Sequence, residues 1–135
     1  MASRPSLSEA EREVLKVLWD YGPGTVREIN EVLEHRGRRW AYTTVATLLQ
    51  RLGAKQYVAG DSSAVAHVYR AIVTRDELLK RRLKDTADEL CDGQAAPLIL
   101  ALVHSSRFSA KEVARLRRLL DKGTGGSALT SKLKP

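Results

Sequence analysis

The 135-residue chain has little of what would point to a secreted or membrane-bound protein. It has one cysteine, Cys91, so no disulfide can form within the chain, which fits a reducing compartment. Its longest apolar run, Ala95 to Val103, is interrupted by Pro97 and is shorter than the roughly 20 residues of a membrane span. The first residues lack the apolar core of a signal peptide. These absences predict a cytoplasmic protein without membrane insertion.

Residues suited to catalysis or metal binding are also few and scattered. His35, His67 and His104 fall in different predicted elements, without the spacing of a metal site. Cys91 has no base near it in the sequence, which favours a structural thiol over a nucleophile. No glycine-rich phosphate loop and no serine nucleophile motif is present. We therefore expect no catalytic residue, no cofactor and no metal.

Positive charge, in contrast, is abundant and unevenly distributed. The chain has 23 lysines and arginines and 16 aspartates and glutamates, which gives a net charge of +7 at pH 7. Residues 36–70 hold six basic side chains and one acidic one, whereas residues 1–35 hold four basic and seven acidic side chains. A basic region of this kind favours a polyanionic partner such as nucleic acid.

Four capping boxes predict where helices begin, because each places a hydroxyl residue three positions before a glutamate. The pairs are Ser8 with Glu11, Thr25 with Glu28, Thr74 with Glu77, and Ser109 with Glu112. Apolar residues at helical spacing follow each box. We expect the helices that begin at Ser8 and Thr25 to end at Gly22 and near Gly37. The helix that begins at Thr74 should end at Asp92. Pro97 suits the first turn of a further helix.

A helix predicted from about Ala41 to Gly53 has an unusual exposed face. Its apolar residues recur at helical spacing and form a buried face of Val45, Leu48, Leu49 and Leu52. The remaining faces carry hydroxyls, an amide and one cation, on Tyr42, Thr43, Thr44, Thr47, Gln50 and Arg51. Such side chains can enter a DNA groove and hydrogen-bond to bases or phosphates. An ordinary solvated helix face is the alternative for this stretch alone.

Two predicted strands follow this helix. Gln56–Ala59 and Val65–Arg70 are rich in strand-forming residues, and Gly60–Ser63 between them is typical of a turn. Three short helices followed by a hairpin is the order of a winged helix-turn-helix, in which the third helix enters the major groove. We therefore predict a mainly α fold with a small β-wing. Winged helices also bind proteins, so an adaptor for an acidic partner protein is the second hypothesis.

The apolar helix near the carboxyl end predicts an interface between two copies of the chain. Leu98–Val103 is apolar nearly all round, and two flanking amphipathic helices are too few to cover it. We expect a homodimer whose contacts include Leu98, Ile99, Leu102, Val103, Leu116, Leu119 and Leu120. Packing of this helix on the amino-terminal domain is the alternative.

These elements divide the chain into four parts. They are a flexible tail (1–6), a winged helix-turn-helix domain (7–73), a helical dimerisation domain (74–122) and a disordered tail (123–135).

Several motifs resemble those of the penicillinase repressors of the BlaI/MecI type. The resemblance runs from residue 7 to residue 122 and looks most like the actinobacterial branch. Its most specific part is the run Trp40–Leu52, which reads WAYTTVATLLQRL. Further matches are Leu7–Glu11, Val14–Trp19, Thr25–Ile29, Ala66–Tyr69 and Leu116–Asp121.

The resemblance implies a dimeric transcriptional repressor that binds a palindromic operator in double-stranded DNA. It implies base contacts from Tyr42, Thr43, Thr44 and Thr47. Candidate phosphate contacts are Arg38, Arg39, Gln50, Arg51, Lys55 and His67. The implied targets are β-lactamase-type or cell-envelope and stress genes, as part of an antibiotic response. A regulatory membrane protease is the further partner that the resemblance suggests.

The chain also departs from the family pattern. A lysine common in the family is replaced by Thr43, and the predicted wing turn carries Asp61 and no positive charge. Ala101–Leu102 stands where related repressors have a cleavable Asn-Phe bond. The paired cysteines of copper-responsive relatives are absent, since Cys91 is alone. We therefore expect weaker wing contacts, no cleavage at this bond and no copper sensing.

Overall fold

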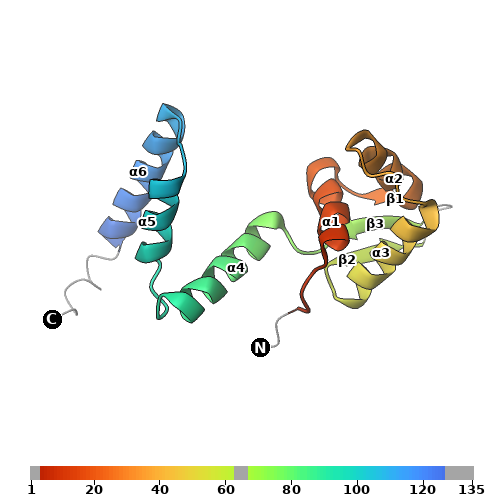
Figure 1. Ribbon diagram of the computed structural model, residues 1–135, viewed down its shortest axis with the longest axis horizontal. Helices are drawn as coiled ribbons and strands as arrows, with labels where there is room; N and C mark the ends of the chain where they lie inside the picture. Colours follow the sequence, from red (N-terminus) through yellow and green to blue (C-terminus); the bar gives the residue numbers. More distant parts are fainter. Residues whose placement is uncertain (1–3, 63–66, 127–135) are drawn as a thin grey trace. The chain divides into compact units, whose positions relative to one another are not determined.

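The computed structural model describes residues 4–62 and 67–126, and these residues form six helices and a three-stranded sheet (Figure 1). The chain divides into a first unit, residues 1–83, and a second unit, residues 84–135. The first unit contains α1 (Glu9–Tyr21), β1 (Gly24–Thr25), α2 (Val26–His35), α3 (Tyr42–Ala54), β2 (Val58–Asp61) and β3 (Val68–Ala71). Helix α4 (Arg75–Leu90) crosses the boundary, and α5 (Ala96–Ser105) and α6 (Ala110–Gly126) lie in the second unit.

All four predicted capping boxes are confirmed. In each box the hydroxyl accepts a hydrogen bond from the glutamate N–H, and the glutamate carboxylate accepts one from the hydroxyl residue's N–H. These bonds satisfy amide groups that would otherwise have no partner in the first turn. Helix α3 is different, because its N-cap residue is Ala41, which makes no side-chain hydrogen bond to the helix.

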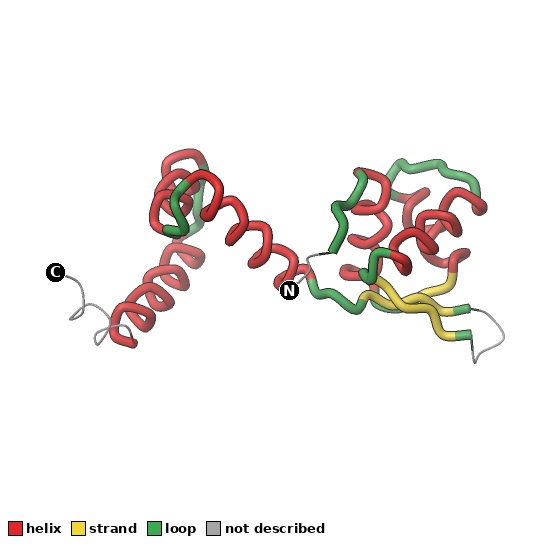
Figure 2. Tube along the Cα trace, turned by 90° about the horizontal axis from the view of Figure 1, so that it is seen from below, coloured by secondary structure: helices red, strands yellow, loops and turns green. Residues whose placement is uncertain are grey.

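The core of the first unit lies between its helices and its sheet. Figure 2 shows the three strands on one side of the helices α1, α2 and α3. The predicted inner face of α3 is confirmed, since Val45, Leu48, Leu49 and Leu52 are all buried. Burying each such side chain stabilises the fold by about 1.5–3 kcal/mol. The core therefore fixes which face of α3 points outward.

The sheet has the strand order β1-β3-β2, and both pairs are antiparallel. Strand β2 begins at Val58, not at Gln56 as predicted, because the chain first turns sharply out of α3. Gln56 has a positive φ of 68°, and the Tyr57 N–H donates to the Leu52 carbonyl oxygen at 2.9 Å. This bond is typical of a helix that ends with a left-handed residue. The two-residue strand β1 was not predicted, and the predicted turn residue Ser63 lies outside the described part.

The first turns of α4 belong to the first unit, so the boundary lies inside α4 and not before it. The indole Nε1 of Trp19 donates to the Val73 carbonyl oxygen at 2.7 Å. Leu78 packs against the buried core. Arg75 donates to the Asp20 carboxylate at 2.7 Å. These contacts hold the start of α4 against α1.

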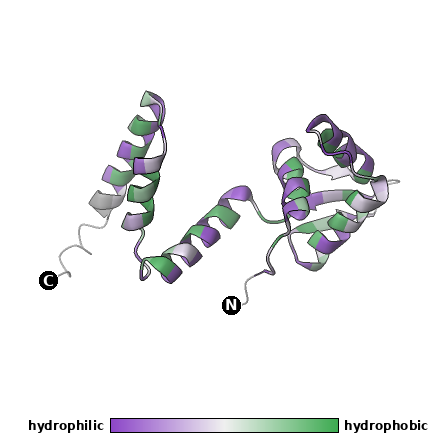
Figure 3. Cartoon of the chain, viewed as in Figure 1, coloured by the Kyte–Doolittle hydropathy of each residue, from purple (hydrophilic) through white to green (hydrophobic). Residues whose placement is uncertain are grey.

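The second unit has almost no interior of its own. Ala87 is the one buried side chain among described residues 84–123, and α5 has none. Hydrophobic residues recur along α5 and α6 in Figure 3. Helix α6 continues to Gly126, so residues 123–126 are helical and not part of the predicted tail, while residues 127–135 lie outside the description. Among the described residues, no helix is long and apolar enough to cross a membrane.

Candidate nucleic-acid interface

The outward face of α3 brings the predicted base-contacting residues together. Tyr42, Thr43, Thr44 and Thr47 are all exposed, and so are the predicted phosphate contacts Gln50 and Arg51. A shallow depression of about 300 Å³ lies on this face. It is lined by Thr43, Thr44, Thr47, Leu48 and Arg51. The face can therefore offer hydroxyl donors and acceptors beside one fixed positive charge.

The amino end of α3 is open to an anion. Ala41 provides no side-chain cap and is itself exposed, so the first-turn amide groups keep their hydrogen-bonding capacity. Aligned peptide dipoles give this end a partial positive charge, which attracts phosphate. Arg39 precedes the helix and is exposed. Among the described residues, neither Arg39 nor Arg51 has an ion-pair partner.

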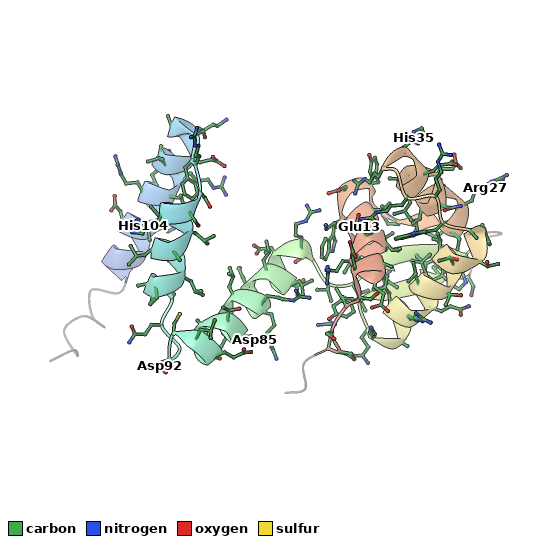
Figure 4. The ribbon with its side chains drawn as sticks, in the orientation of Figure 1. Glu13, Arg27, His35, Asp85, Asp92 and His104 are labelled. Atoms are coloured by element: carbon green, nitrogen blue, oxygen red, sulfur yellow. The ribbon has the colours of Figure 1, made fainter. Side chains whose placement is uncertain are left out.

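The Arg38 side chain faces carboxylates on α1. Its guanidinium lies 3.7 Å from the Glu9 carboxylate and 3.9 Å from that of Glu13, both on α1. The same group lies 5.9 Å from the centre of the Trp40 ring. Figure 4 labels Glu13 on α1. Arg38 therefore joins the segment before α3 to α1, and part of its charge is balanced within the protein.

Lys55 is likewise held inside the protein, at the other end of α3. Its ammonium group donates to the Glu11 carboxylate at 2.7 Å and to the Ser6 carbonyl oxygen at 2.8 Å. The Glu11 side chain is buried, with 2% of its surface exposed. Burial alone would raise the pKa of Glu11, but the hydrogen bonds from Lys55 and Ser8 lower that pKa below its ordinary value. The pair is thus charged and links the start of α1 to the end of α3.

The residues before α1 also contact the end of α3. Arg4 Nε donates to the Gln56 carbonyl oxygen at 2.7 Å, and the Tyr57 hydroxyl donates to the Pro5 carbonyl oxygen at 2.7 Å. Together with the bond from Lys55 to Ser6, these contacts hold residues 4–6 in place. Residues 4–6 are therefore not the frayed tail that the sequence suggested, and residues 1–3 lie outside the description. No local pattern could predict these contacts, because the partners are about fifty positions apart in the sequence.

On the wing, His67 lies flat against Tyr69, with ring centres 4.7 Å apart and planes 10° from parallel. It also covers Gly60, where an added Cβ would collide with the imidazole. Gly60 therefore makes room for His67, whose exposed side chain lies directly before β3 on the wing. Residues 63–66 lie outside the described part.

The predicted dimer contacts lie on the second unit and are largely open to solvent. Leu98 is half-buried, and the other six are between 38% and 56% exposed: Ile99, Leu102, Val103, Leu116, Leu119 and Leu120.

The histidines of the chain lie in different elements. His35 is on α2 and His104 is on α5 (Figure 4). In the described ranges, no group of three or more His, Cys, Asp or Glu could hold a metal ion.

Residues 7–122 match the family model described as "Penicillinase repressor". The chain belongs to the penicillinase repressor family of transcriptional regulators. A relative from this family, the transcriptional regulator BlaI of Mycobacterium tuberculosis, is 39% identical over 122 residues, which span 89% of this chain and 86% of the relative. The resemblance seen in the sequence is therefore confirmed.

Other members of the family are more distant. The penicillinase repressor of Bacillus licheniformis is 22% identical over 121 residues, which span 90% of this chain and 94% of that protein. The solution structure of B. licheniformis BlaI with the blaP half-operator aligns with 57% of this chain and 93% of its own, at 27% identity and a TM-score of 0.48. These relatives are named as repressors and regulators, not as enzymes.

Proposed function

We propose that this protein is a sequence-specific DNA-binding repressor that acts as a dimer on a palindromic operator. The observation that carries the proposal is the outward face of α3. Threonine hydroxyls, an uncapped helix start and two arginines without an ion-pair partner among the described residues occur together there. Membership of the penicillinase repressor family supports it.

The proposed roles on α3 follow from the chemistry of each group. Tyr42, Thr43, Thr44 and Thr47 reach base edges in the major groove, where hydroxyls can donate and accept hydrogen bonds. Gln50, Arg39, Arg51 and the amide groups at the start of α3 bind phosphates and fix the position of the helix. His67, directly before β3, would add a contact from the wing.

Lys55 and Arg38 have a different proposed role. Their positive charges face carboxylates on α1, so contacting phosphate would cost them existing ion pairs. We propose that they position α3 and the segment before it. This assignment changes the expectation from the sequence, which made both residues phosphate contacts.

The exposed apolar surface of the second unit supports the proposed dimer. Exposed apolar side chains on α5 and α6 need a cover, and a second copy supplies a matching surface by two-fold symmetry. A two-fold dimer presents two α3 helices, which is why its operator would be palindromic. By family membership, the proposed targets are β-lactamase-type or cell-envelope genes.

A regulatory membrane protease is a proposed partner only in a restricted sense. Ala101 and Leu102 stand on α5, where the family pattern leads one to expect Asn-Phe. A protease that released this repressor would therefore have to recognise a different peptide bond.

Binding of the full-length protein to promoter fragments from its own genomic neighbourhood tests the proposal. We expect a sequence-selective complex whose affinity falls as salt rises, because phosphate contacts release counterions. Arg51→Gln should reduce the slope of log affinity against log salt by about one. Lys55→Gln is the matched variant at the same end of α3, and it should leave that slope unchanged because Lys55 is paired with Glu11.

Two outcomes would count against this assignment. Absence of any selective complex at low salt, together with capture of an acidic protein, would favour the adaptor hypothesis. An equal loss of slope in the Lys55 and Arg51 variants would show that Lys55 leaves Glu11 to contact phosphate.

A further inference from the structure

A groove between α1 and the first turns of α4 shares no residue with the α3 face. It has a volume of about 330 Å³, and all of its lining residues lie in the first unit. One stripe of residues from each helix forms its walls. The stripes are Arg12, Lys16 and Trp19 on α1, and Arg75, Leu78, Leu79 and Arg82 on α4.

The floor of this groove is apolar. The Trp19 ring is fixed by its Nε1 hydrogen bond to the Val73 carbonyl oxygen, so it offers only its hydrocarbon surface to the groove. Leu79 is 52% exposed, although it lies beside Trp19 and Leu78. A partly exposed leucine beside an indole is an apolar surface that a ligand could cover.

The rim of the groove is cationic. Four of the lining residues are lysine or arginine, and no carboxylate residue lines it in the part of the chain that the structure describes. Lys16 is paired with Glu13 and Arg75 with Asp20. Arg12 instead donates to the neutral Leu7 carbonyl oxygen at 3.2 Å, and among described residues no carboxylate lies within ion-pair distance of it. Its charge is therefore available to an anion.

We propose that this groove binds a small organic anion with an apolar body, such as a medium-chain carboxylate. The carboxylate would bind at Arg12, and the apolar body would lie against Trp19 and Leu79. The volume is near the lower end of the range of small-molecule sites, which suits a ligand of this size. Helix α4 belongs to both units. A metabolite bound between α1 and α4 would therefore contact the helix that joins the two units. This site does not depend on the proposed DNA-binding function.

Fluorescence of Trp19 in the full-length protein tests the proposal. The chain has two tryptophans, so Trp40→Phe leaves Trp19 as the single indole. Titration with decanoate should give a saturable change, and decanol, which has the same chain without the charge, should bind about tenfold more weakly. Arg12→Gln should weaken the binding of decanoate by about tenfold and leave the binding of decanol unchanged. Lys80→Gln is the matched control, because Lys80 is an exposed cation on α4 that does not line the groove.

A second pair of variants tests the apolar floor. Leu79→Glu should abolish binding, whereas Leu83→Glu, one turn further along α4 and outside the lining, should not. No saturable change with decanoate, or equal binding of decanol and decanoate, would overturn the proposal. So would a monomer mass for Leu79→Glu alone by light scattering, because a second copy of the chain would then be the occupant. If Leu79→Glu fails to fold by circular dichroism, the Arg12 comparison decides.

Discussion

The two units of this protein handle their apolar side chains in opposite ways. The first unit buries leucines and valines from α1, α2 and α3 in a core of its own. The second unit contains comparable leucines on α5 and α6, yet leaves them exposed. The difference teaches that the first unit has a core within one chain, whereas the described part of the second unit has almost none. In the proposed dimer, the stability of the second unit would therefore depend on a partner surface.

The largest expected effect comes from a cavity in the first unit. Leu49 is fully buried, so Leu49→Ala should lower the free energy of unfolding by roughly 2–5 kcal/mol. Because its contacts lie within one chain, the loss should be the same at every protein concentration. Leu119→Ala should lower stability only at concentrations where the dimer forms. Urea unfolding at several protein concentrations measures the loss of stability in both variants. If the two losses depend on protein concentration in the same way, the distinction between the units does not hold.

The next effect concerns assembly. Leu102 is 50% exposed on α5, and Leu102→Glu should place a charge in the proposed dimer interface. We expect a monomer by light scattering and a loss of operator affinity of about 100-fold, because the two half-sites would no longer be bound together. Tyr21→Gln is the control, since Tyr21 is a 66% exposed residue of the first unit. A Leu102→Glu protein that stays dimeric would contradict the proposed interface.

A smaller effect tests the ion pair that helps to make the first unit self-sufficient. Glu11→Gln should cost about 1–3 kcal/mol, because Lys55 loses its charged acceptor. The folded-state pKa of Glu11 is lowered, so its stabilisation is present above the unfolded pKa of about 4.3 and is lost as pH falls through the folded value. The free energy of unfolding should therefore fall less steeply below pH ~4.3 in Glu11→Gln than in the wild type. Asp20 and Glu77, whose pKa values are also lowered, supply the slope that remains in both proteins. Identical slopes would mean that folding does not lower the pKa of Glu11.

The smallest effect separates stability from binding within the first unit. Ala41→Ser should cap α3 and raise the free energy of unfolding by about 1 kcal/mol. Ala41→Asp should stabilise similarly, but its charge should repel phosphate and weaken operator binding several-fold. Thermal unfolding and binding titrations check the pair. If both variants are stabilised and bind DNA as tightly as the wild type, the start of α3 makes no phosphate contact.

The features that were predictable from the sequence depend on residues close together in it. Each capping box joins positions three apart, and the buried face of α3 follows from helical spacing. The features that were missed depend on distant partners. Lys55 reads as a free cation until Glu11, 44 positions away, folds against it. The short strand β1 exists only because β3 pairs with it, and Gln56 turns left-handed to let Tyr57 reach the core. The roles of the α3 residues stay predictions, since they depend on DNA.

The contacts of residues 4–6 with the end of α3 have a practical consequence for anyone who purifies this protein. Arg4, Pro5 and Ser6 are bonded to Gln56, Tyr57 and Lys55, so a purification tag fused before Met1 would begin three residues from these contacts. Such a tag can pull on the segment that steadies the proposed recognition helix. A tag after Pro135 is attached to the other unit, and it is the better choice for binding measurements.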